Sequence, residues 1–364
     1  MAAAATFGGL WRRLLTSVYT RHLLLVTLFT TAMLVTITLL MSPLTPIVWT
    51  ERSHCVAAVN RKHQRSLSEN NSVNPTNSST SGHRRFIVNN VHLCDGVVDD
   101  DGMTSFPVFV VIVHSRPGQR GRMQRDAIRA TWGSTLHRRV AEPDIRLAFM
   151  LGRDQECVNV ASSCSAALRR ESRLYRDVII ADFVDTYRSL SLKSLSGLTW
   201  ARRHCRAARY IVKVDDDVYM RPELLPRLRQ LTSNSSESVI VGSLNVNSTV
   251  QRRGLWRVDD RTFPAPVFPP YCSGNTYAMT SSVADRLLTV AKTDGELTSA
   301  PFPLEDVYVT ALLATSVGAK CVHDDAFPRW DVGPSRANVE RLRDGSLLAI
   351  HSVHYTQMYD IVRS

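Results

Sequence analysis

The sequence has no basic tail and no zinc-finger pattern. Its 44 Lys and Arg against 33 Asp and Glu give a formal net charge of +11, which by itself invites a nucleic-acid partner. The Arg residues are instead scattered through predicted helices and loops. We therefore expect no nucleic acid, and an anionic small substrate or an acidic membrane surface accounts for the excess charge equally well.

Charge is also missing from a long stretch near the N-terminus. Between Arg21 and Glu51 there is no Lys, Arg, Asp or Glu, and residues 23–41 are nearly all apolar or Thr. Roughly 20 such residues allow a helix to cross a bilayer core. A cleavable signal peptide has a shorter apolar run and an A-x-A-like exit, whereas prolines follow here. The sequence therefore predicts an uncleaved signal anchor over residues 22–42; a buried core helix is the alternative.

The charges around this span predict its orientation. Arg12, Arg13 and Arg21 precede it, and the positive-inside tendency keeps such residues in the cytosol. We therefore expect a cytosolic tail over residues 1–21, a single-pass type II membrane protein, and a luminal remainder.

Two further features fit a luminal location. Sequons without an intervening proline occur at Asn70, Asn77, Asn234 and Asn247. Seven cysteines would form disulfides in an oxidising compartment, and their odd number leaves at least one free or paired between chains. Cys55 is the candidate for pairing between chains, and hence for a homo-oligomer linked through the stem. Cys157 and Cys164 are near enough in sequence to pair, although the sequence does not determine connectivity.

Aromatic residues are scarce from about residue 50 to residue 81, where Ser, Asn, Thr, Arg and His dominate. Such a segment buries too little apolar surface to fold, so we expect a glycosylated tether. We assign residues 43–105 to this luminal stem and residues 106–364 to one folded domain, which begins with an apolar run at Phe106.

Apolar, β-branched runs alternate with helical patterns in the predicted domain. Strands are expected at 106–115, 145–152, 209–214, 238–244 and 346–353. Helices are expected at 122–133, where Gly133 closes the helix, and at 190–205, 284–291 and 305–318. This order predicts an α/β fold with a mostly parallel central sheet flanked by helices. Ligands bind beyond the carboxyl ends of the strands in such sheets.

Three consecutive aspartates, Asp215, Asp216 and Asp217, follow the strand predicted at 209–214. They therefore fall where an α/β sheet binds its ligands. Clustered carboxylates suit a hard divalent ion such as Mn²⁺ or Mg²⁺. Because side chains alternate along a strand, Asp215 and Asp217 would face the same way. An ordinary solvated turn is the alternative.

A second acidic pair, Glu305 and Asp306, opens a helical pattern after a proline. Acidic residues in a first helical turn favour the helix dipole, which is the simpler explanation. The other explanation is that one of them is a general base beside the metal site, where it would accept a proton from a substrate hydroxyl.

Basic and imidazole side chains supply further candidates. Arg125 and Arg129 lie four residues apart on a predicted helix, with Trp132 on the next turn. Arg forks match phosphate geometry, so the pair suits a diphosphate, with a solvated Arg face as the alternative. His351 and His354 follow the last strand pattern. A lone His is more often structural, but imidazole can join carboxylates around Mn²⁺.

The order of these motifs is more specific than any one of them. It is carried by "VIVHSRPGQRGRMQRDAIRATWG", "DFVDTYRSLSLKSLSGLTW", "YIVKVDDDVYM", "PPYCSGNTYAMT", "EDVYVT" and "IHSVHYTQM". Over about residues 106–362 the chain resembles the β-1,3-glycosyltransferases of the galactosyltransferase family (glycosyltransferase family 31). The resemblance implies a Golgi type II membrane enzyme with a luminal catalytic domain of GT-A type. It also implies inverting transfer from UDP-galactose or UDP-N-acetylglucosamine to the 3-hydroxyl of a sugar acceptor on a glycoprotein or glycolipid.

The resemblance also implies roles for individual residues. Asp306 matches the catalytic base, with Glu305 as the fallback. The metal, Mn²⁺, would be held by Asp217, Asp215 and His351. Contacts to the UDP part would come from Arg125, Arg129, Trp132, Lys213, Asp215 and Asp216.

The chain departs from the family pattern at two places. The family usually has "SGGGY" where this chain has Ser273 to Tyr277, so Asn275 and Thr276 replace glycines that allow close backbone approach. Thr310 replaces the Gly that often follows "EDVYV". The altered glycine segment supports a rival hypothesis, a non-catalytic luminal sugar-binding protein or partner subunit on the same fold. Another rival is a metal-dependent phosphoryl hydrolase, which would need no acceptor alcohol.

Overall fold

The structure is a computed structural model. It describes residues 85–98, 102–139, 145–154, 163–233, 238–293 and 301–363. The predicted tail, anchor and most of the stem lie outside these residues, as do Asn70, Asn77, Asn234, Cys55 and Cys157. Among the helices in the described ranges, none is long and apolar enough to cross a membrane.

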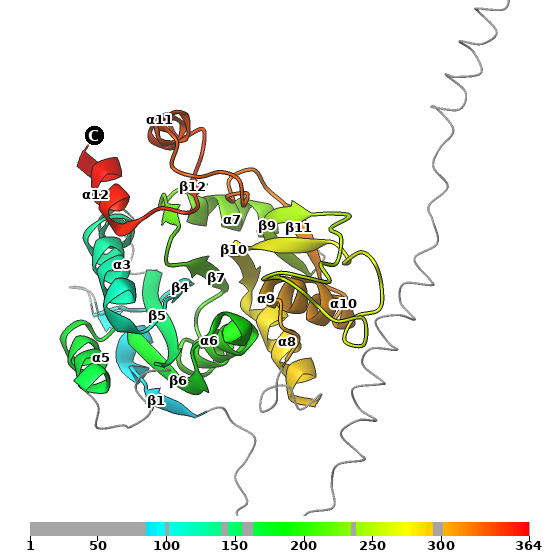
Figure 1. The fold of residues 1–364 in the computed structure, drawn as a ribbon. Helices are drawn as coiled ribbons and strands as arrows, with labels where there is room; N and C mark the ends of the chain where they lie inside the picture. The colour runs from blue at the N-terminus through cyan, green and yellow to red at the C-terminus, as the bar shows by residue number, and fades with distance from the viewer. Residues whose placement is uncertain are drawn as a thin grey trace, which may run out of the picture. The chain divides into compact units, whose positions relative to one another are not determined.

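A sheet of eight strands, in the order β1-β6-β5-β4-β7-β10-β9-β11, forms the centre of the domain (Figure 1). The strands are β1 (Phe86–Val88), β4 (Phe109–His114), β5 (Ile145–Arg153), β6 (Val178–Val184), β7 (Tyr210–Asp215), β9 (Val239–Asn245), β10 (Tyr271–Thr280) and β11 (Lys320–His323). The block β6-β5-β4-β7 is parallel throughout, and β11 is parallel to β9. Strand β10 runs antiparallel to both β7 and β9, and β1 runs antiparallel to β6. The predicted α/β class and parallel block are confirmed.

The run at β4 shows why this sheet has unbroken apolar strands. All six of its residues are buried. Val110 and Ile112 contribute to one hydrophobic core, while Val111 and Val113 contribute to another on the opposite face. Because successive side chains of a strand point to opposite faces, a strand covered on both sides must be apolar at every position.

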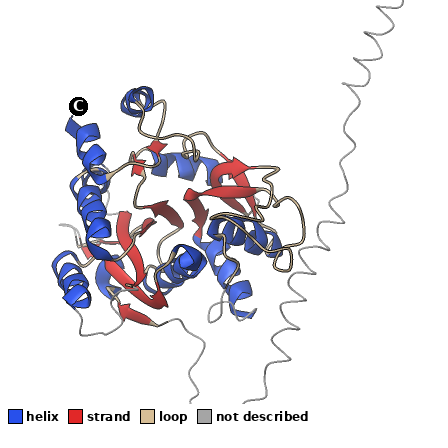
Figure 2. Cartoon of the chain, viewed as in Figure 1, coloured by secondary structure: helices blue, strands red, loops and turns tan. Residues whose placement is uncertain are grey.

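Helices form the two outer layers (Figure 2). One core includes side chains of α6 (Leu190–His204), α8 (Ser281–Thr293) and the helix that runs from α9 (Glu305–Val307) through η3 (Tyr308–Leu313) to α10 (Ala314–Ser316). The other includes side chains of α3 (Gly118–Ala130), α4 (Trp132–Arg139), α5 (Ser163–Tyr175), α7 (Leu224–Ser233), α11 (Arg336–Asp344) and α12 (Tyr355–Arg363).

Several elements differ from the sequence prediction, which did not include strand β6 or the helices α5, α7, α11 and α12. Gly133 does not close a helix, because α3 ends at Ala130 and α4 continues past Gly133. The last predicted strand is only β12 (Ala349–Ile350), which pairs with β8 (Tyr219–Met220) outside the large sheet. Strand β10 was not predicted. Its polar residues 273–276 interrupt the apolar pattern, and they coincide with a register shift against β9 between Cys272 and Tyr277.

The folded domain begins before Phe106. Strand β1 forms one edge of the large sheet, and Cys94 at the end of η1 (Val91–Cys94) forms a disulfide with Cys205 after α6. Strands β2 (Val97–Val98) and β3 (Thr104–Ser105) make a small hairpin. Residues 86–98, which the sequence analysis placed in the stem, are thus part of the domain. The second disulfide, Cys272–Cys321, joins β10 to β11.

Candidate active site

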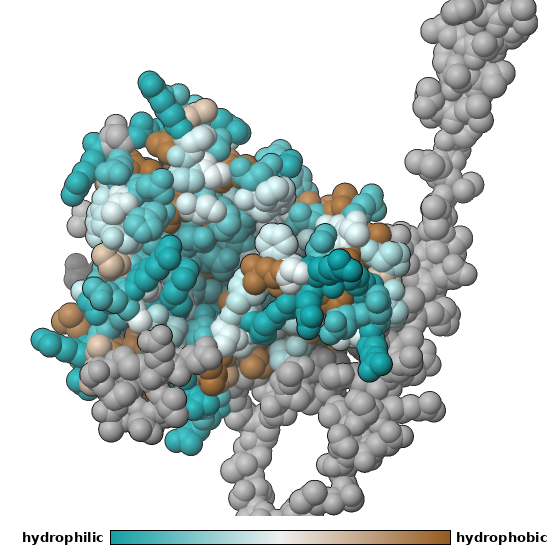
Figure 3. Space-filling model, in the orientation of Figure 1, coloured by the Kyte–Doolittle hydropathy of each residue, from teal (hydrophilic) through white to brown (hydrophobic). Residues whose placement is uncertain are grey.

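The candidate site lies at the carboxyl ends of β4 and β7. His114, the last residue of β4, is in register with Asp215, the last residue of β7. Asp216 and Asp217 continue from there into the turn that leads to β8. Figure 3 shows a hollow, lined mostly by hydrophilic residues, in the middle of the same view of the molecule. The carboxyl ends of the strands are the position at which parallel α/β sheets bind ligands.

Asp215, Asp217 and His351 come together from distant parts of the chain. Each offers one ligand atom, and these atoms lie within 4.8 Å of one another. His351 Nε2 is 3.4 Å from Asp217 Oδ2. The segment that carries His351 is held in place because Val353 N donates to the Asp217 carbonyl (2.7 Å). Two carboxylates and one imidazole form a donor set that suits Mn²⁺, so these residues fit the predicted ion.

Electrostatics in this cluster favour a bound cation. Burial raises the pKa of Asp217 to about 6, and the negative charge of Asp215 adds to that effect. The crowded carboxylates thus disfavour their own ionised form, and a positive charge among them would relieve the repulsion.

Asp216 plays a different part from its two neighbours. It is buried and accepts a hydrogen bond from Ser115 Oγ (2.8 Å), which in turn accepts one from Arg125 Nη1 (3.0 Å). Burial raises the pKa of Asp216. This side chain therefore ties the aspartate turn to the loop after β4. It was predicted to contact the diphosphate, but in the structure it is directed to protein partners.

Lys213 connects the aspartates to β10. Its Nζ donates to Asp215 Oδ1 (2.5 Å) and to the carbonyl of Gly274. Burial by itself would lower the pKa of Lys213, but the carboxylates of Asp215 and Glu305 raise it above its ordinary value. Lys213 therefore stays charged, and it holds Asp215 in place beside the bulge of β10.

The second acidic pair lies on the first turn of α9, and its two members are not equivalent. Glu305 is buried and accepts hydrogen bonds from Ser194 Oγ and from Tyr277 OH (2.6 Å). Asp306 is partly exposed and accepts a hydrogen bond from Val307 N (2.9 Å). Burial raises the pKa of both acids, that of Glu305 to about 7. Asp306 is therefore the acid that a substrate can reach, and Glu305 is occupied by protein donors.

Gly274 allows β10 to approach these acids. A Cβ at Gly274 would lie 3.2 Å from Asp306 Cβ and 3.4 Å from Glu305 Oε2, which is close enough to force a shift. The next two residues, Asn275 and Thr276, are buried. The contact with the acids thus requires a glycine only at position 274, and this is the glycine of the family pattern that the chain keeps.

Thr310, the other departure from the family pattern, has a structural role. Its Oγ1 donates to the Asp306 carbonyl (2.6 Å) and accepts from Cys272 N (2.9 Å). It therefore ties the helix that carries Asp306 to β10, next to the Cys272–Cys321 disulfide.

Arg125, Arg129 and Trp132 are not brought to the site as ligand contacts. Arg125 is fully buried and donates to both carboxylate oxygens of Glu171 (2.8 and 2.6 Å). Arg129 donates to Glu171 and to both oxygens of Asp177, each at 2.8 Å. Trp132 is fully buried in the core. Arg125 Nη1 also donates to Ser115 Oγ and to the Arg116 carbonyl. Because oxygens of the protein already take the donors of both arginines, these side chains have a scaffolding role in the structure.

Several residues of the site were not predicted from the sequence. Lys193 Nζ donates to the Ser115 carbonyl (2.7 Å) and pairs with Asp185 (2.8 Å) under the loop after β4. Ser194, on the same helix, and Tyr277, on β10, both hold Glu305. The sequence feature that could have indicated these residues is the polarity of α6, in which Lys193 and Ser194 are buried among apolar neighbours. Buried polar side chains need partners, so they indicate a polar site nearby.

The sequence of the folded region defines the class of protein. Residues 123–325, more than half of the chain, match the model of the galactosyltransferase family. The chain belongs to this family.

Particular relatives are similar over most of the folded domain. Mouse β-1,3-galactosyltransferase 4 is 32% identical over 256 residues, which are 62% of this chain and 63% of the relative. The human protein of the same name is 33% identical over 234 residues (56% and 59%). Human β-1,3-galactosyltransferase 1 is 25% identical over 278 residues (76% and 77%). The chain thus spans about six tenths of the length of the first two relatives.

One solved structure resembles the domain only weakly. It is a glycosyltransferase involved in the glycosylation of the major capsid of PBCV-1, with 9% identity and a TM-score of 0.36; the match covers 70% of this chain and all of that one. The fold is defined by the order and direction of the strands in the sheet.

The raised pKa of Glu305 predicts a pH-dependent stability. We expect the free energy of unfolding to fall by up to about 3 kcal/mol as the pH rises from 4.5 to 7, because the unfolded chain loses this proton first. Glu305→Gln keeps an acceptor for Ser194 and Tyr277 but cannot titrate, so its stability should change less with pH. Urea unfolding of both proteins between pH 4 and pH 8 measures the difference. Parallel pH profiles would contradict the assignment.

Proposed function

We propose that this protein is an inverting β-1,3-glycosyltransferase with a GT-A type fold. It moves galactose or N-acetylglucosamine from a UDP-sugar to the 3-hydroxyl of a sugar acceptor on a glycoprotein or glycolipid. The observation that carries the proposal is the position of Asp306. This partly exposed acid lies against Gly274 of β10, and the carbonyl of Gly274 is linked through Lys213 to Asp215 of the metal-type cluster.

The site residues support a single displacement. Asp306 accepts the proton of the acceptor 3-hydroxyl as that oxygen attacks the anomeric carbon. The new C–O bond forms on the face opposite UDP, while the bond to UDP breaks and its electron pair leaves with the diphosphate. An α-linked donor therefore gives a β-linked product, through a transition state that resembles an oxocarbenium ion.

The other charged residues prepare the site for the leaving group. Asp215, Asp217 and His351 would hold Mn²⁺, which when bound stabilises negative charge on a diphosphate. Lys213 keeps Asp215 oriented, and Glu305 keeps the first turn of α9 against α6 and β10. We extend the proposal to a single-pass type II protein of the Golgi membrane with the folded domain in the lumen.

The experiment is an assay of UDP release by the full chain purified in detergent. UDP-galactose and UDP-N-acetylglucosamine are supplied separately, with and without Mn²⁺, against a panel of β-linked sugar acceptors. Acceptor-dependent release with one donor supports the transferase and identifies the sugar. Release that needs no acceptor indicates hydrolysis. A folded protein that binds UDP without turnover contradicts the enzyme and favours a sugar-binding protein or partner subunit.

His351→Ala tests the metal cluster. We expect the Mn²⁺ concentration for half-maximal UDP release to rise at least about tenfold, because a direct ligand is lost and even outer-sphere partners commonly contribute that much to metal affinity. His354→Ala is the matched control, since His354 is exposed and its Nδ1 bonds to Thr356 outside the cluster. Equal Mn²⁺ requirements in the two variants would remove His351 from the metal site.

A further inference from the structure

The connection between β9 and β10, residues 246–270, is long but is held together by its own side chains. Arg252 donates from Nη1 to the carbonyls of Val258 and Phe263 (2.8 Å each) and from Nη2 to that of Ala265 (2.9 Å). Phe263 packs against Phe268, with ring centroids 5.2 Å apart. Ordered loops of this length inside a compact domain are commonly functional.

Two exposed aromatic rings are fixed to each other where this loop meets the start of α6. Trp256 is 57% exposed, and its Nε1 donates to the hydroxyl of Tyr187 (2.6 Å), which is itself 45% exposed. Arg188, next to Tyr187, donates to the carbonyls of Leu255 (2.6 Å) and Arg257 (3.1 Å). One hydrogen bond therefore fixes the Trp256 indole, and two more fix the backbone on either side of it. Because the exposed indole contributes little hydrophobic stabilisation, this preorganisation indicates a surface that binds a ligand.

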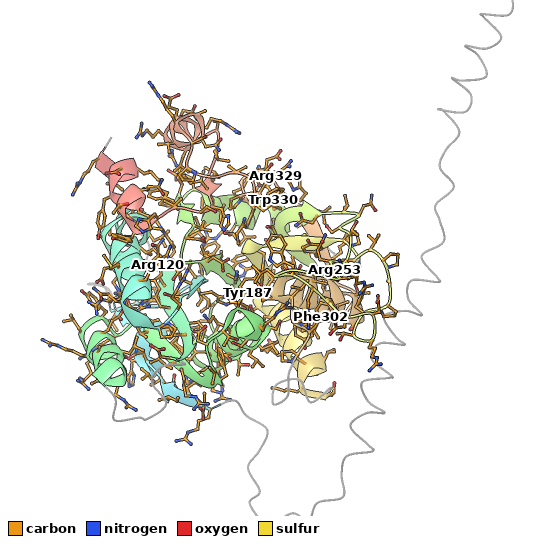
Figure 4. The ribbon with its side chains drawn as sticks, viewed as in Figure 1. Arg120, Tyr187, Arg253, Phe302, Arg329 and Trp330 are labelled. Carbon is orange, nitrogen blue, oxygen red and sulfur yellow. A yellow bond between two sulfur atoms is a disulfide. The ribbon has the colours of Figure 1, made fainter. Side chains whose placement is uncertain are left out.

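This aromatic pair lies on the same side of the site as Asp306. Tyr187 belongs to η2 (Tyr187–Ser189), which runs directly into α6. Ser191 on the first turn of α6 donates to the Phe302 carbonyl (2.6 Å), and Ser194 donates to Glu305, the neighbour of Asp306. Tyr187 and Phe302 are labelled in Figure 4, and the Ser191–Phe302 hydrogen bond links the elements that carry them.

The electrostatics agree with this placement. Burial raises the pKa of Tyr187, the hydrogen bond from Trp256 lowers it, and the charges of Asp306 and Asp215 raise it again. The pKa of Tyr271, at the start of β10, is likewise raised by burial and by the charge of Asp306. Both phenol groups therefore lie within electrostatic reach of Asp306, the partly exposed acid.

We propose that Trp256 and Tyr187 form the acceptor subsite, in which a hexopyranose ring stacks on the Trp256 indole and presents its hydroxyl to Asp306. The inference rests on the proposed function and adds to it the place where the acceptor binds. The C–H groups on one face of a sugar carry partial positive charge, which the negative face of an aromatic ring attracts. Tyr and Trp also offer a polar end, so they suit a ligand that is apolar on one side and hydroxylated on its edges.

The acceptor fits this place better than the donor does. Inversion requires the attacking oxygen to arrive opposite UDP, and the metal-type cluster of Asp215, Asp217 and His351 marks the diphosphate side. The aromatic pair is instead attached to the start of α6, and this helix bonds through Ser191 and Ser194 to the segment that carries Phe302 and Glu305. A ring held there would place a hydroxyl near the base without displacing the diphosphate.

The test compares Trp256→Ala, Trp256→Phe and wild type in the full chain, with the acceptor that gives the fastest UDP release. We expect the acceptor KM of Trp256→Ala to rise about three- to tenfold, as for a lost ring-stacking contact. The affinity for UDP and the kcat at saturating acceptor should change less than twofold, and Trp256→Phe should recover most of the KM. Phe106→Ala is the matched control, because Phe106 is 49% exposed and precedes β4 at the opposite end of the strand.

Two results would overturn the inference: an unchanged acceptor KM in Trp256→Ala, or a loss confined to UDP affinity. Saturation-transfer NMR with the same β-linked oligosaccharides tests the subsite without turnover. If wild type is inactive but binds an oligosaccharide and Trp256→Ala does not, the subsite stands while the proposed reaction fails. If both bind equally, or neither binds, the subsite is contradicted.

Discussion

Replacing Asp306 with Asn is expected to reduce acceptor-dependent transfer by about 10²- to 10⁴-fold, the usual contribution of a general base. Asn retains an oxygen that can accept the hydrogen bond from Val307 N, so the first turn of α9 should remain intact. The affinity for UDP should be unchanged, because Asp306 is outside the cluster of Asp215, Asp217 and His351. Steady-state UDP release and isothermal titration with UDP measure the two effects separately.

Glu305→Gln is the matched control for this experiment. Glu305 is the adjacent carboxylate on the same helical turn, but it is buried and accepts from Ser194 and Tyr277. We expect it to lose at most about tenfold in activity, since Gln keeps the accepting oxygen and no proton of the substrate reaches this side chain. A larger loss in Glu305→Gln than in Asp306→Asn would exchange the two assignments.

The sequence was sufficient for the features that depend on local pattern. The apolar β-branched runs of β4, β5, β7 and β9 predict strands that are buried on both faces, and the structure confirms this. Asp215 and Asp217 were expected to face the same way and their carboxylates do come together, although β7 ends at Asp215 and the turn after it positions Asp217. The residues alone offered His351 or His354 as the imidazole beside these carboxylates, and the family resemblance selected His351, because β12 pairs outside the large sheet and no local signal brings it to β7.

Other features depend on contacts that a local pattern does not contain. Strand β10 has polar residues at 273–276, which do not form a strand pattern. The close packing of Gly274 against Glu305 and Asp306, which are distant in sequence, explains its conformation. Arg125 and Arg129 have the spacing of a phosphate-binding pair, but their carboxylate partners come from the distant Glu171 and Asp177. The same helical spacing serves either role, and only the tertiary partner decides between them.

The buried pair of Arg125 and Glu171 leads to the second large prediction. Arg125→Met is expected to lower the free energy of unfolding by about 3–5 kcal/mol, because it leaves a buried carboxylate with fewer partners. The double variant Arg125→Met/Glu171→Leu should recover much of this loss, since two apolar side chains leave no unpaired charge. Urea unfolding of both single variants and the double variant gives the coupling free energy.

Arg122→Met is the control on the same helix. Arg122 is half-buried, pairs with Asp126 (2.6 Å) and only approaches Glu171 (3.6 Å), so its removal should cost at most about 1 kcal/mol. UDP affinity then separates the two interpretations of Arg125. A direct contact with the diphosphate would be charge-assisted, and its loss would weaken UDP binding at least about tenfold in molecules that remain folded. Since the Arg125 guanidinium bonds to Glu171 and to Ser115, which in turn bonds to Asp216, we expect it to support the protein and not to contact the nucleotide. Its loss should then cost much stability and change the affinity for UDP by less than about tenfold.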